Sequence, residues 1–225
     1  MNCVVAGIVD GSRIVWVVLV CGCLLGMAFV GVACRDTDIG PGTSGMTDRL
    51  KLGVREARSG RTFMESALFD VKLSAEEVAA AKGYVMGHPD VSAYILLMSL
   101  REHAPVAYAG IPDACKARVL CDALANLTFL NDFGYLESSA SYDDMAGKAL
   151  ITIGKPAVNC LRALLGDKSQ APLFGSEAAT LSGFLQYRRA DFAYRYIMLI
   201  LGKQPAFPAD TAERDKLISD LQEQP

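Results

Sequence analysis

The sequence predicts an all-helical domain that follows an apolar N-terminal segment. Residues 14–32 carry neither a charge nor a proline, and from residue 47 onward the apolar residues recur at helical spacing. No segment alternates apolar and polar residues as a half-buried strand would. Helix-capping residues and glycine or proline stops recur along the second part. We therefore expect that part to consist of helices joined by turns.

The apolar segment has the layout of a secretory signal. Arg13 precedes it, the run from Ile14 to Val32 follows, and the small residue Ala33 stands before Cys34. A second interpretation is a retained membrane-spanning helix, because the run approaches the roughly 20 residues that cross the hydrocarbon core. Basic residues flank both sides and do not decide between the two. Both interpretations place the remainder of the chain on the same side of the membrane.

The residues around the expected cleavage point resemble the bacterial lipobox. In that family a small residue precedes a cysteine that is lipidated and becomes the new N-terminus, and Ala33 and Cys34 match these positions. Gly31 stands where the family prefers leucine. The resemblance implies lipidation of Cys34 and a location in the bacterial cell envelope, facing the periplasm or the exterior. The retained helix would instead give a single-pass inner-membrane protein.

The expected organisation is a signal peptide or membrane anchor at residues 1–33, a flexible tether at 34–46 and an all-helical domain at 47–225. The tether is rich in glycine, threonine and aspartate, and such a coil spans roughly 20 Å on average. Removal of the signal leaves about 190 residues, which is enough for one domain with a core. The net charge of −3, with both signs interspersed, offers no basic patch for nucleic acid.

Capping residues locate the first two helices. The first is expected at residues 47–58 with Thr47 as its N-cap. The second begins with a capping box, in which Ser74 and Glu77 each satisfy a free backbone N–H of the other, and it ends near Gly87.

Four further helices follow in the middle of the chain. Asp90 is expected to cap a helix over residues 91–103, which is apolar nearly all round and should lie at the centre of the domain. The next helix covers about 112–127. A third begins at Ser141 or Asp143 and ends at a glycine, and a fourth covers 157–165 after a proline that suits its first turn.

The last two of these helices resemble a HEAT-type repeat. In that family an aspartate starts one helix, a glycine and a proline form the corner, and a second helix of valine and leucines ends at an aspartate. The matching residues here are Asp144, Gly154, Pro156, Val158, Leu161, Leu164, Leu165 and Asp167. A fainter copy holds Asp191, Ala193, Ile197, Leu201, Gly202, Arg214, Asp215, Ile218 and Leu221.

The two copies lie at about 143–167 and 190–222, a separation close to the roughly 40–47 residues of such repeats. The resemblance implies stacked antiparallel helix pairs, a short α-solenoid, that binds partners through its surface. The family has no catalytic residues to transfer to this chain.

Four of the seven cysteines follow the signal. Cys115 and Cys121 lie six residues apart on one expected helix, about 9 Å along its axis, which is too far for a bridge. Cys121 follows the apolar spacing of that helix, which favours a buried thiol. A bridge from Cys160 to Cys115 or to Cys121 stays open. No pair has the spacing of a zinc or redox site.

The histidines and acidic pairs favour structural roles. His88 and His103 both lie at the ends of expected helices, where a cation suits the helix dipole. Asp143 and Asp144 stand at a helix start and are best explained as a cap. The chain contains no nucleophile elbow and no phosphate-binding loop. We therefore assign no catalytic residue, metal or cofactor.

The segment from Lys168 to Arg188 is longer than a turn between such repeats requires, and long loops are often functional. With the start of the following helix it gathers hydroxyls, carboxylates, an aromatic ring and two guanidinium groups, a mixture that suits partner binding. The competing interpretation is that the arginines form ion pairs that hold the insertion on the repeat. The candidate partner-binding residues are Ser176, Glu177, Tyr187, Arg188, Arg189 and Asp191.

These features favour a membrane-tethered cell-envelope protein whose helical repeats serve as an interaction or scaffold module for a protein partner. The alternative is a periplasmic hydrolase or transferase with a site near Glu177, Arg188 and Asp191.

Overall fold

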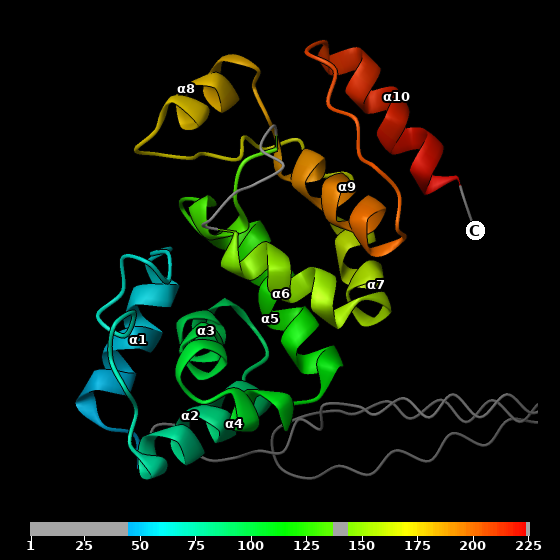
Figure 1. Ribbon diagram of the computed structural model, residues 1–225. Coiled ribbons are helices and arrows are strands. Elements are labelled where there is room, and N and C mark those ends of the chain that lie inside the picture. The colour runs from blue at the N-terminus through cyan, green and yellow to red at the C-terminus, as the bar shows by residue number, and fades with distance from the viewer. Residues whose placement is uncertain (1–44, 137–143, 224–225) are drawn as a thin grey trace, which may run out of the picture. The chain divides into compact units, whose positions relative to one another are not determined.

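The computed structural model describes residues 45–136 and 144–223 (Figure 1). Within those ranges the secondary structure consists of ten α-helices and two 3₁₀-helices, without a strand, so the predicted all-helical class is confirmed. The expected signal or anchor at 1–33, Cys34 and the tether up to residue 44 lie outside the described residues. So do Ser141 and Asp143. None of the described helices combines the length and apolar composition that crossing a membrane requires.

The first half of the domain contains five α-helices and a 3₁₀-helix. They are α1 (Asp48–Arg58), α2 (Ala75–Gly87), η1 (Val91–Ala93), α3 (Tyr94–His103), α4 (Pro105–Ala109) and α5 (Asp113–Asn126). The second half contains a 3₁₀-helix and five α-helices. They are η2 (Asn131–Phe133), α6 (Met145–Ile153), α7 (Lys155–Leu164), α8 (Glu177–Phe184), α9 (Arg189–Ile200) and α10 (Thr211–Gln222).

Three of the helix starts read from the sequence carry the expected capping bond, whereas Asp144, also expected as a cap, is the N-cap residue of α6 but makes no side-chain capping bond. Thr47 accepts the backbone N–H of Leu50 at the start of α1. At the start of α2, Ser74 Oγ accepts the N–H of Glu77 at 3.2 Å, and the Glu77 carboxylate accepts the N–H of Ser74 at 2.9 Å. The Asp90 side chain accepts the N–H of Ser92 at 2.8 Å and so begins η1, which continues into α3. These bonds satisfy donors that a helix start otherwise leaves free.

Helix α3 lies at the centre of the first half, as its apolar composition predicts. Every residue from Tyr94 to Leu100 is buried, and the helix contacts α1, α2, α4 and α5 (Figure 1). Helix α5 then connects the halves, because it packs on α3 and on both α6 and α7.

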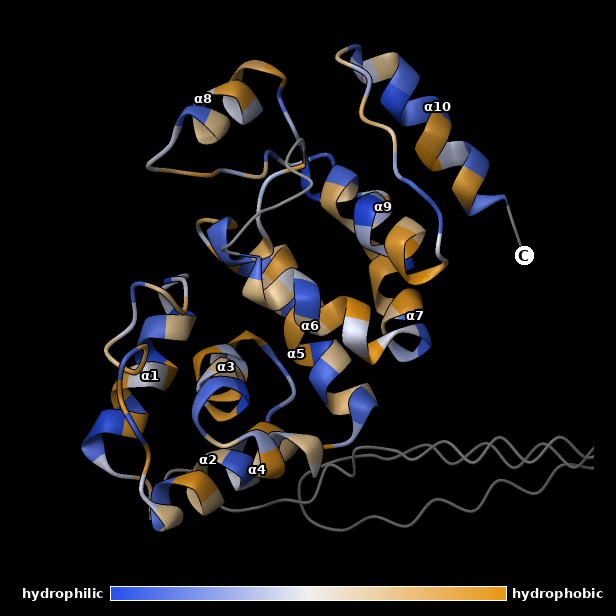
Figure 2. Cartoon of the chain, in the orientation of Figure 1, coloured by the Kyte–Doolittle hydropathy of each residue, from blue (hydrophilic) through white to orange (hydrophobic). Residues whose placement is uncertain are grey.

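Helix α9 has the corresponding place in the second half. All residues from Arg189 to Ile197 are buried, and α9 contacts α6, α7 and α10. Helix α10 buries only Arg214, Ile218 and Leu221. Figure 2 shows the corresponding pattern, with mostly hydrophilic residues along α10 and apolar residues toward the end of α9.

A disulfide joins helices α5 and α7. Cys121 on α5 is bonded to Cys160 on α7, with 6.0 Å between their Cα atoms, a separation usual for this bond. The structure therefore selects one of the two pairings that the sequence left open.

Three local expectations need correction. Helix α4 and helix α8 were not predicted, and α8 lies inside the segment that was expected to be a long loop. Met46, the last residue of the expected tether, is buried in the core because it packs at the start of α1.

Candidate functional site

The residues predicted to bind a partner fall into two groups. Tyr187, Arg188, Arg189 and Asp191 are buried where α9 begins. Ser176 and Glu177 are exposed at the start of α8, where Ser176 caps the helix by accepting the N–H of Ala179 at 3.1 Å. The structure therefore brings four of the six together, and it leaves the other two on the surface.

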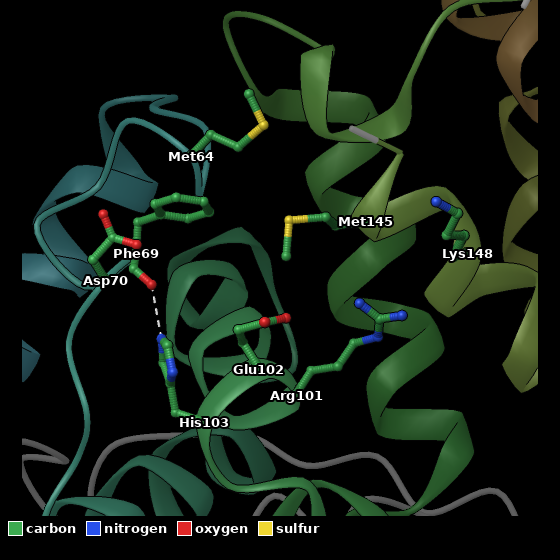
Figure 3. Close-up of a pocket in the computed structure, with 8 residues that line it drawn as sticks. All are labelled: Met64, Phe69, Asp70, Arg101, Glu102, His103, Met145 and Lys148. Carbon is green, nitrogen blue, oxygen red and sulfur yellow. Dashed lines mark hydrogen bonds between the residues drawn. The ribbon is translucent and has the colours of Figure 1, made fainter. Parts of the chain in front are cut away.

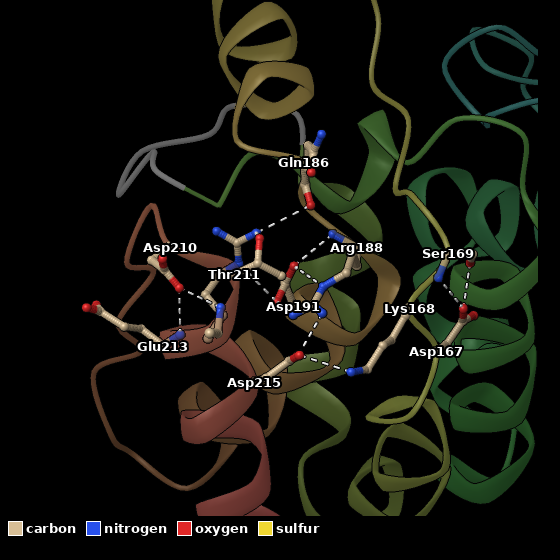
Figure 4. Close-up of polar contacts among 12 residues, drawn as sticks. Asp167, Lys168, Ser169, Gln186, Arg188, Asp191, Asp210, Thr211, Glu213 and Asp215 are labelled. Carbon is tan, nitrogen blue, oxygen red and sulfur yellow. Dashed lines mark hydrogen bonds and ion pairs between the residues drawn. The ribbon is translucent and has the colours of Figure 1, made fainter.

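The buried group is a charge network at the start of α9 (Figure 4). The Asp191 carboxylate accepts the backbone N–H of Arg188 at 2.8 Å and its Nη2–H at 3.1 Å. Arg188 Nη1 donates to Asp215 on α10 at 2.7 Å, and Lys168 Nζ donates to the same carboxylate at 3.0 Å. The network thus ties the insertion to α9 and α10.

The protonation behaviour of this network follows from its hydrogen bonds. Those from Lys168 and Arg188 lower the pKa of Asp215. Burial lowers the pKa of Arg188, but its bonds to Asp191 and Asp215 outweigh burial and raise it. The network therefore favours the ionised forms of the Asp215 carboxylate and the Arg188 guanidinium.

Arg214 on α10 closes the network from the other side and is only 2 % exposed. Its guanidinium donates to the carbonyl oxygens of Pro208 and Leu185, at 2.8 and 2.9 Å. It also lies over the Tyr187 ring, 5.1 Å from the centroid, and its Nε is 3.5 Å from Asp191. The side chain therefore holds α10 to the segment just before it and to the residue that follows α8.

Arg189 points the other way, into the end of α5. It donates to the carbonyl oxygens of Leu124 and Leu127, the second at 2.7 Å. These are carbonyls that a helix end leaves without partners. Burial lowers the pKa of Arg189. The competing interpretation is that the arginines hold the insertion in place, and it describes Arg188 well. Arg189 instead donates to backbone carbonyls. Glu177 lies exposed on α8.

Helix α8 presents the predicted surface residues beside two exposed apolar ones. Phe184 is 82 % exposed and Leu181 is 41 % exposed. Ala179 and Ser182 are the residues that α8 buries. Its outer face therefore combines an aromatic ring and an aliphatic side chain with the polar groups of Ser176 and Glu177.

A separate cleft of about 420 Å³ lies between the two halves of the domain (Figure 3). The loop between α1 and α2, the last turn of α3 and the first turn of α6 form its walls. The lining residues are Met64, Phe69, Asp70, Arg101, Glu102, His103, Met145 and Lys148.

A buried carboxylate fixes the loop that forms one wall. Asp132 Oδ2 accepts the backbone N–H of Phe63 at 2.5 Å and the hydroxyl of Tyr94 at 2.6 Å. Burial raises the pKa of Asp132, although its bond to Tyr94 opposes this. Burial also raises the pKa of Tyr94. The next residue along the loop, Met64, is thereby positioned at the cleft.

The polar groups of the cleft differ in how they are engaged. His103 Nε2 donates to the carbonyl oxygen of Phe69 at 2.7 Å, since the carbonyl can only accept. Lys148 forms an ion pair with Asp144 at 3.0 Å. The side chains of Asp70, Arg101 and Glu102, by contrast, make no hydrogen bond or ion pair with any residue in the described ranges.

Sequence reasoning missed this cleft. Its walls come from three segments that are far apart in the chain, and no short motif connects them. Within residues 45–136 and 144–223, no group of three or more histidine, cysteine or acidic side chains could hold a metal ion. The side chains that line the cleft offer charged groups, hydrogen-bonding groups and apolar surface to a ligand.

Comparisons of the chain with protein-family models, with curated proteins and with solved structures return no match.

Proposed function

We propose that this protein is a membrane-tethered helical domain of the bacterial cell envelope that serves as a protein-interaction or scaffold module. Cys34, lipidated, or a retained apolar helix would provide the tether. The surface that would receive a protein partner is the outer face of α8. The exposed Phe184 ring, with the exposed Leu181 one turn before it, is the observation that carries this proposal, because aromatic side chains are enriched at interfaces.

The disulfide supports the proposed compartment. Stable structural disulfides form in secreted and periplasmic proteins and are rare in the reducing cytosol. The bond between Cys121 and Cys160 spans α5 and α7, so it belongs to the body of the domain. A domain in which these two cysteines form a disulfide is consistent with an N-terminal segment that directs export.

The contacts among the later helices support the finer, repeat-based description. Helices α6 and α7 pack together, as do α9 and α10, and both α6 and α7 contact α9. Two stacked helix pairs of a short HEAT-like solenoid would make these contacts, and the second pair joins the first mainly through α9. In such proteins binding is a property of the surface, which agrees with a partner that docks on α8.

The enzymatic alternative has less support. Arg188 and Asp191 are occupied by each other and by Asp215, and Glu177 is exposed on the separate helix α8. A hydrolase or transferase would need these groups to face a common substrate.

The tether is tested by fractionation and fluorescence. Trp16 is the only tryptophan of the chain, so a processed protein emits as tyrosine alone and a retained helix emits as tryptophan. We expect the wild type in the membrane fraction with a mass increased by the lipid, and a Cys34→Ser variant without that increase. A cytosolic protein with reduced Cys121 and Cys160 would overturn the proposal.

The interaction is tested by photocrosslinking in cells. A photoreactive residue at Thr180, exposed on α8, should give a defined protein adduct. The same residue at Ser219, exposed on α10, should not. Phe184→Asp should abolish the Thr180 adduct while the circular dichroism spectrum stays unchanged. The absence of any adduct at Thr180 in membrane preparations would contradict the proposal.

A further inference from the structure

The cleft between α3 and α6 has an apolar part that adapts to different shapes. Met64 and Met145 project toward it from opposite walls, and Phe69 lies beside them (Figure 3). Methionine side chains are flexible and polarisable, so they pack against apolar groups of varied outline. This part of the cleft therefore suits an aliphatic or aromatic side chain of a ligand.

Arg101 supplies an unused anion-binding group. Its guanidinium lies in the cleft on the same side as Lys148 (Figure 3). The side chain is partly buried, and it makes no hydrogen bond or ion pair with any other residue that the structure describes. A guanidinium presents five N–H donors in a fork that matches a carboxylate. The positive charge of Arg101, in the last turn of α3, also interacts favourably with the helix dipole. This interaction does not use the N–H donors of the guanidinium.

Carboxylates provide the opposite charge. Asp70 lies across the cleft from Arg101 and Lys148, and Glu102 lies between them (Figure 3). Neither carboxylate has a hydrogen-bond or ion-pair partner among the described residues. Both are exposed, and each can accept hydrogen bonds from a cation. The cleft thus offers a cationic side and an anionic side beside an apolar part.

This charge arrangement distinguishes between classes of anion. A phosphate ester carries between one and two negative charges at neutral pH and no positive charge. It would therefore be repelled by the carboxylates of Asp70 and Glu102. A ligand with one carboxylate and one ammonium satisfies both sides. The cleft volume of about 420 Å³ lies within the roughly 300–1,000 Å³ of small-molecule sites.

We propose that this cleft binds a zwitterionic amino acid or short peptide with an apolar side chain. The carboxylate of the ligand pairs with Arg101, supported by Lys148, and its ammonium group pairs with Asp70 or Glu102. Its side chain packs against Met64, Met145 and Phe69. The site is separate from the α8 surface, and the inference does not depend on the tether or on a protein partner.

The test is calorimetric titration of the purified full chain in mild detergent. The probes are free L-leucine, the tripeptide Ala-Ala-Leu, the same tripeptide with a C-terminal amide, its N-acetyl form, and inorganic phosphate. We expect saturable binding of leucine or of the tripeptide, and the comparison identifies which source of the zwitterion is used. Amidation and acetylation should each weaken binding roughly tenfold or more, because each removes a charged partner.

Variants connect the binding to the cleft. Arg101→Gln should weaken binding of the preferred probe roughly tenfold or more. Arg118→Gln serves as a matched control, because Arg118 is exposed on α5 and away from the cleft lining. The proposal fails if neither leucine nor the tripeptide binds, or if phosphate binds more tightly than both. It also fails if Arg101→Gln, shown to be folded by its unchanged thermal melt, binds as the wild type does.

Discussion

Removal of the disulfide should cost a large share of the stability of this domain. Cys121 and Cys160 are separated by 39 residues in the chain. In the chain-entropy treatment a loop of this length gives about 4 kcal/mol of stabilisation, because the bond restricts the unfolded chain. Native domains have only about 5–15 kcal/mol in total. We therefore expect Cys121→Ala with Cys160→Ala to lower the free energy of unfolding by about 2–4 kcal/mol.

The measurement is urea unfolding of the full chain in mild detergent, followed by circular dichroism at 222 nm. Each single substitution breaks the same bond, so Cys121→Ala and Cys160→Ala alone should each lose nearly as much as the double variant. Such strong non-additivity is the signature of a shared interaction. Peptide mapping without reduction should recover the two cysteines as one linked species.

Two outcomes would refute this reasoning. One is a loss below about 1 kcal/mol in the double variant, well under the loop-closure value. The other is a pair of small single losses that add to the double loss, since independent side chains behave in that way.

Three further substitutions, the first paired with a second glycine substitution as its control, test the packing and the charges. Gly147→Ala should destabilise the domain by about 1–3 kcal/mol, because the new Cβ would lie 2.8 Å from the buried Tyr196 ring; Gly83→Ala in α2 meets nothing within 4 Å and should stabilise by about 0.5–1 kcal/mol. Arg214→Met should cost about 3–5 kcal/mol, since it leaves the carbonyl oxygens of Pro208 and Leu185 without their donor and removes one of the two cations beside the buried Asp191. Hydrogen bonds from Arg49, and then from the Ser74 N–H, lower the pKa of Glu77 from 4.5 to about 2, so the stability contributed by its carboxylate is present above about pH 4.5 and is lost as the pH falls toward 2. Glu77→Gln should therefore cost about 1–2 kcal/mol at pH 7, after allowance for the exposure of Arg49, and little at pH 2.

All three are measured as urea midpoints with matched controls. Lys216→Met, at an exposed position of α10, should leave the midpoint near that of the wild type. A stabilising Gly147→Ala would mean that Tyr196 moves away at little cost. A tolerated Arg214→Met would show that the network is not needed to hold α10. A difference between Glu77→Gln and wild type that is the same at every pH would contradict the lowered pKa.

Local signals made much of the fold predictable. Thr47, Ser74 and Asp90 cap helices where the sequence indicates, because a capping bond needs only residues within one turn. The apolar run of α3 predicted a central position because it leaves no polar face for solvent. Helices α4 and α8 were missed, since each is short and α8 has no clear apolar face.

The site depended on packing that sequence patterns do not show. Arg188 and Arg189 have the composition of a docking surface, but their partners lie on other helices, at Asp215 and at the end of α5. Burial of these side chains follows from that packing alone. The bridge from Cys160 to Cys121 likewise required α5 and α7 to be adjacent. The cleft around Arg101 is formed by three segments whose proximity no spacing rule provides.

The residues at the start of α1 are hydrogen-bonded to α2. Thr47 Oγ1 donates to Glu77 at 2.9 Å, and Arg49 donates to the same carboxylate through Nε and Nη2 at 3.2 and 2.5 Å. A mechanical force applied to the chain before Thr47 would therefore act on both α1 and α2 from the start of the extension. Mechanical unfolding from this end would have to break three hydrogen bonds to one carboxylate before α1 could separate from α2. Glu77 would therefore resist a force that reaches the domain through its N-terminal end.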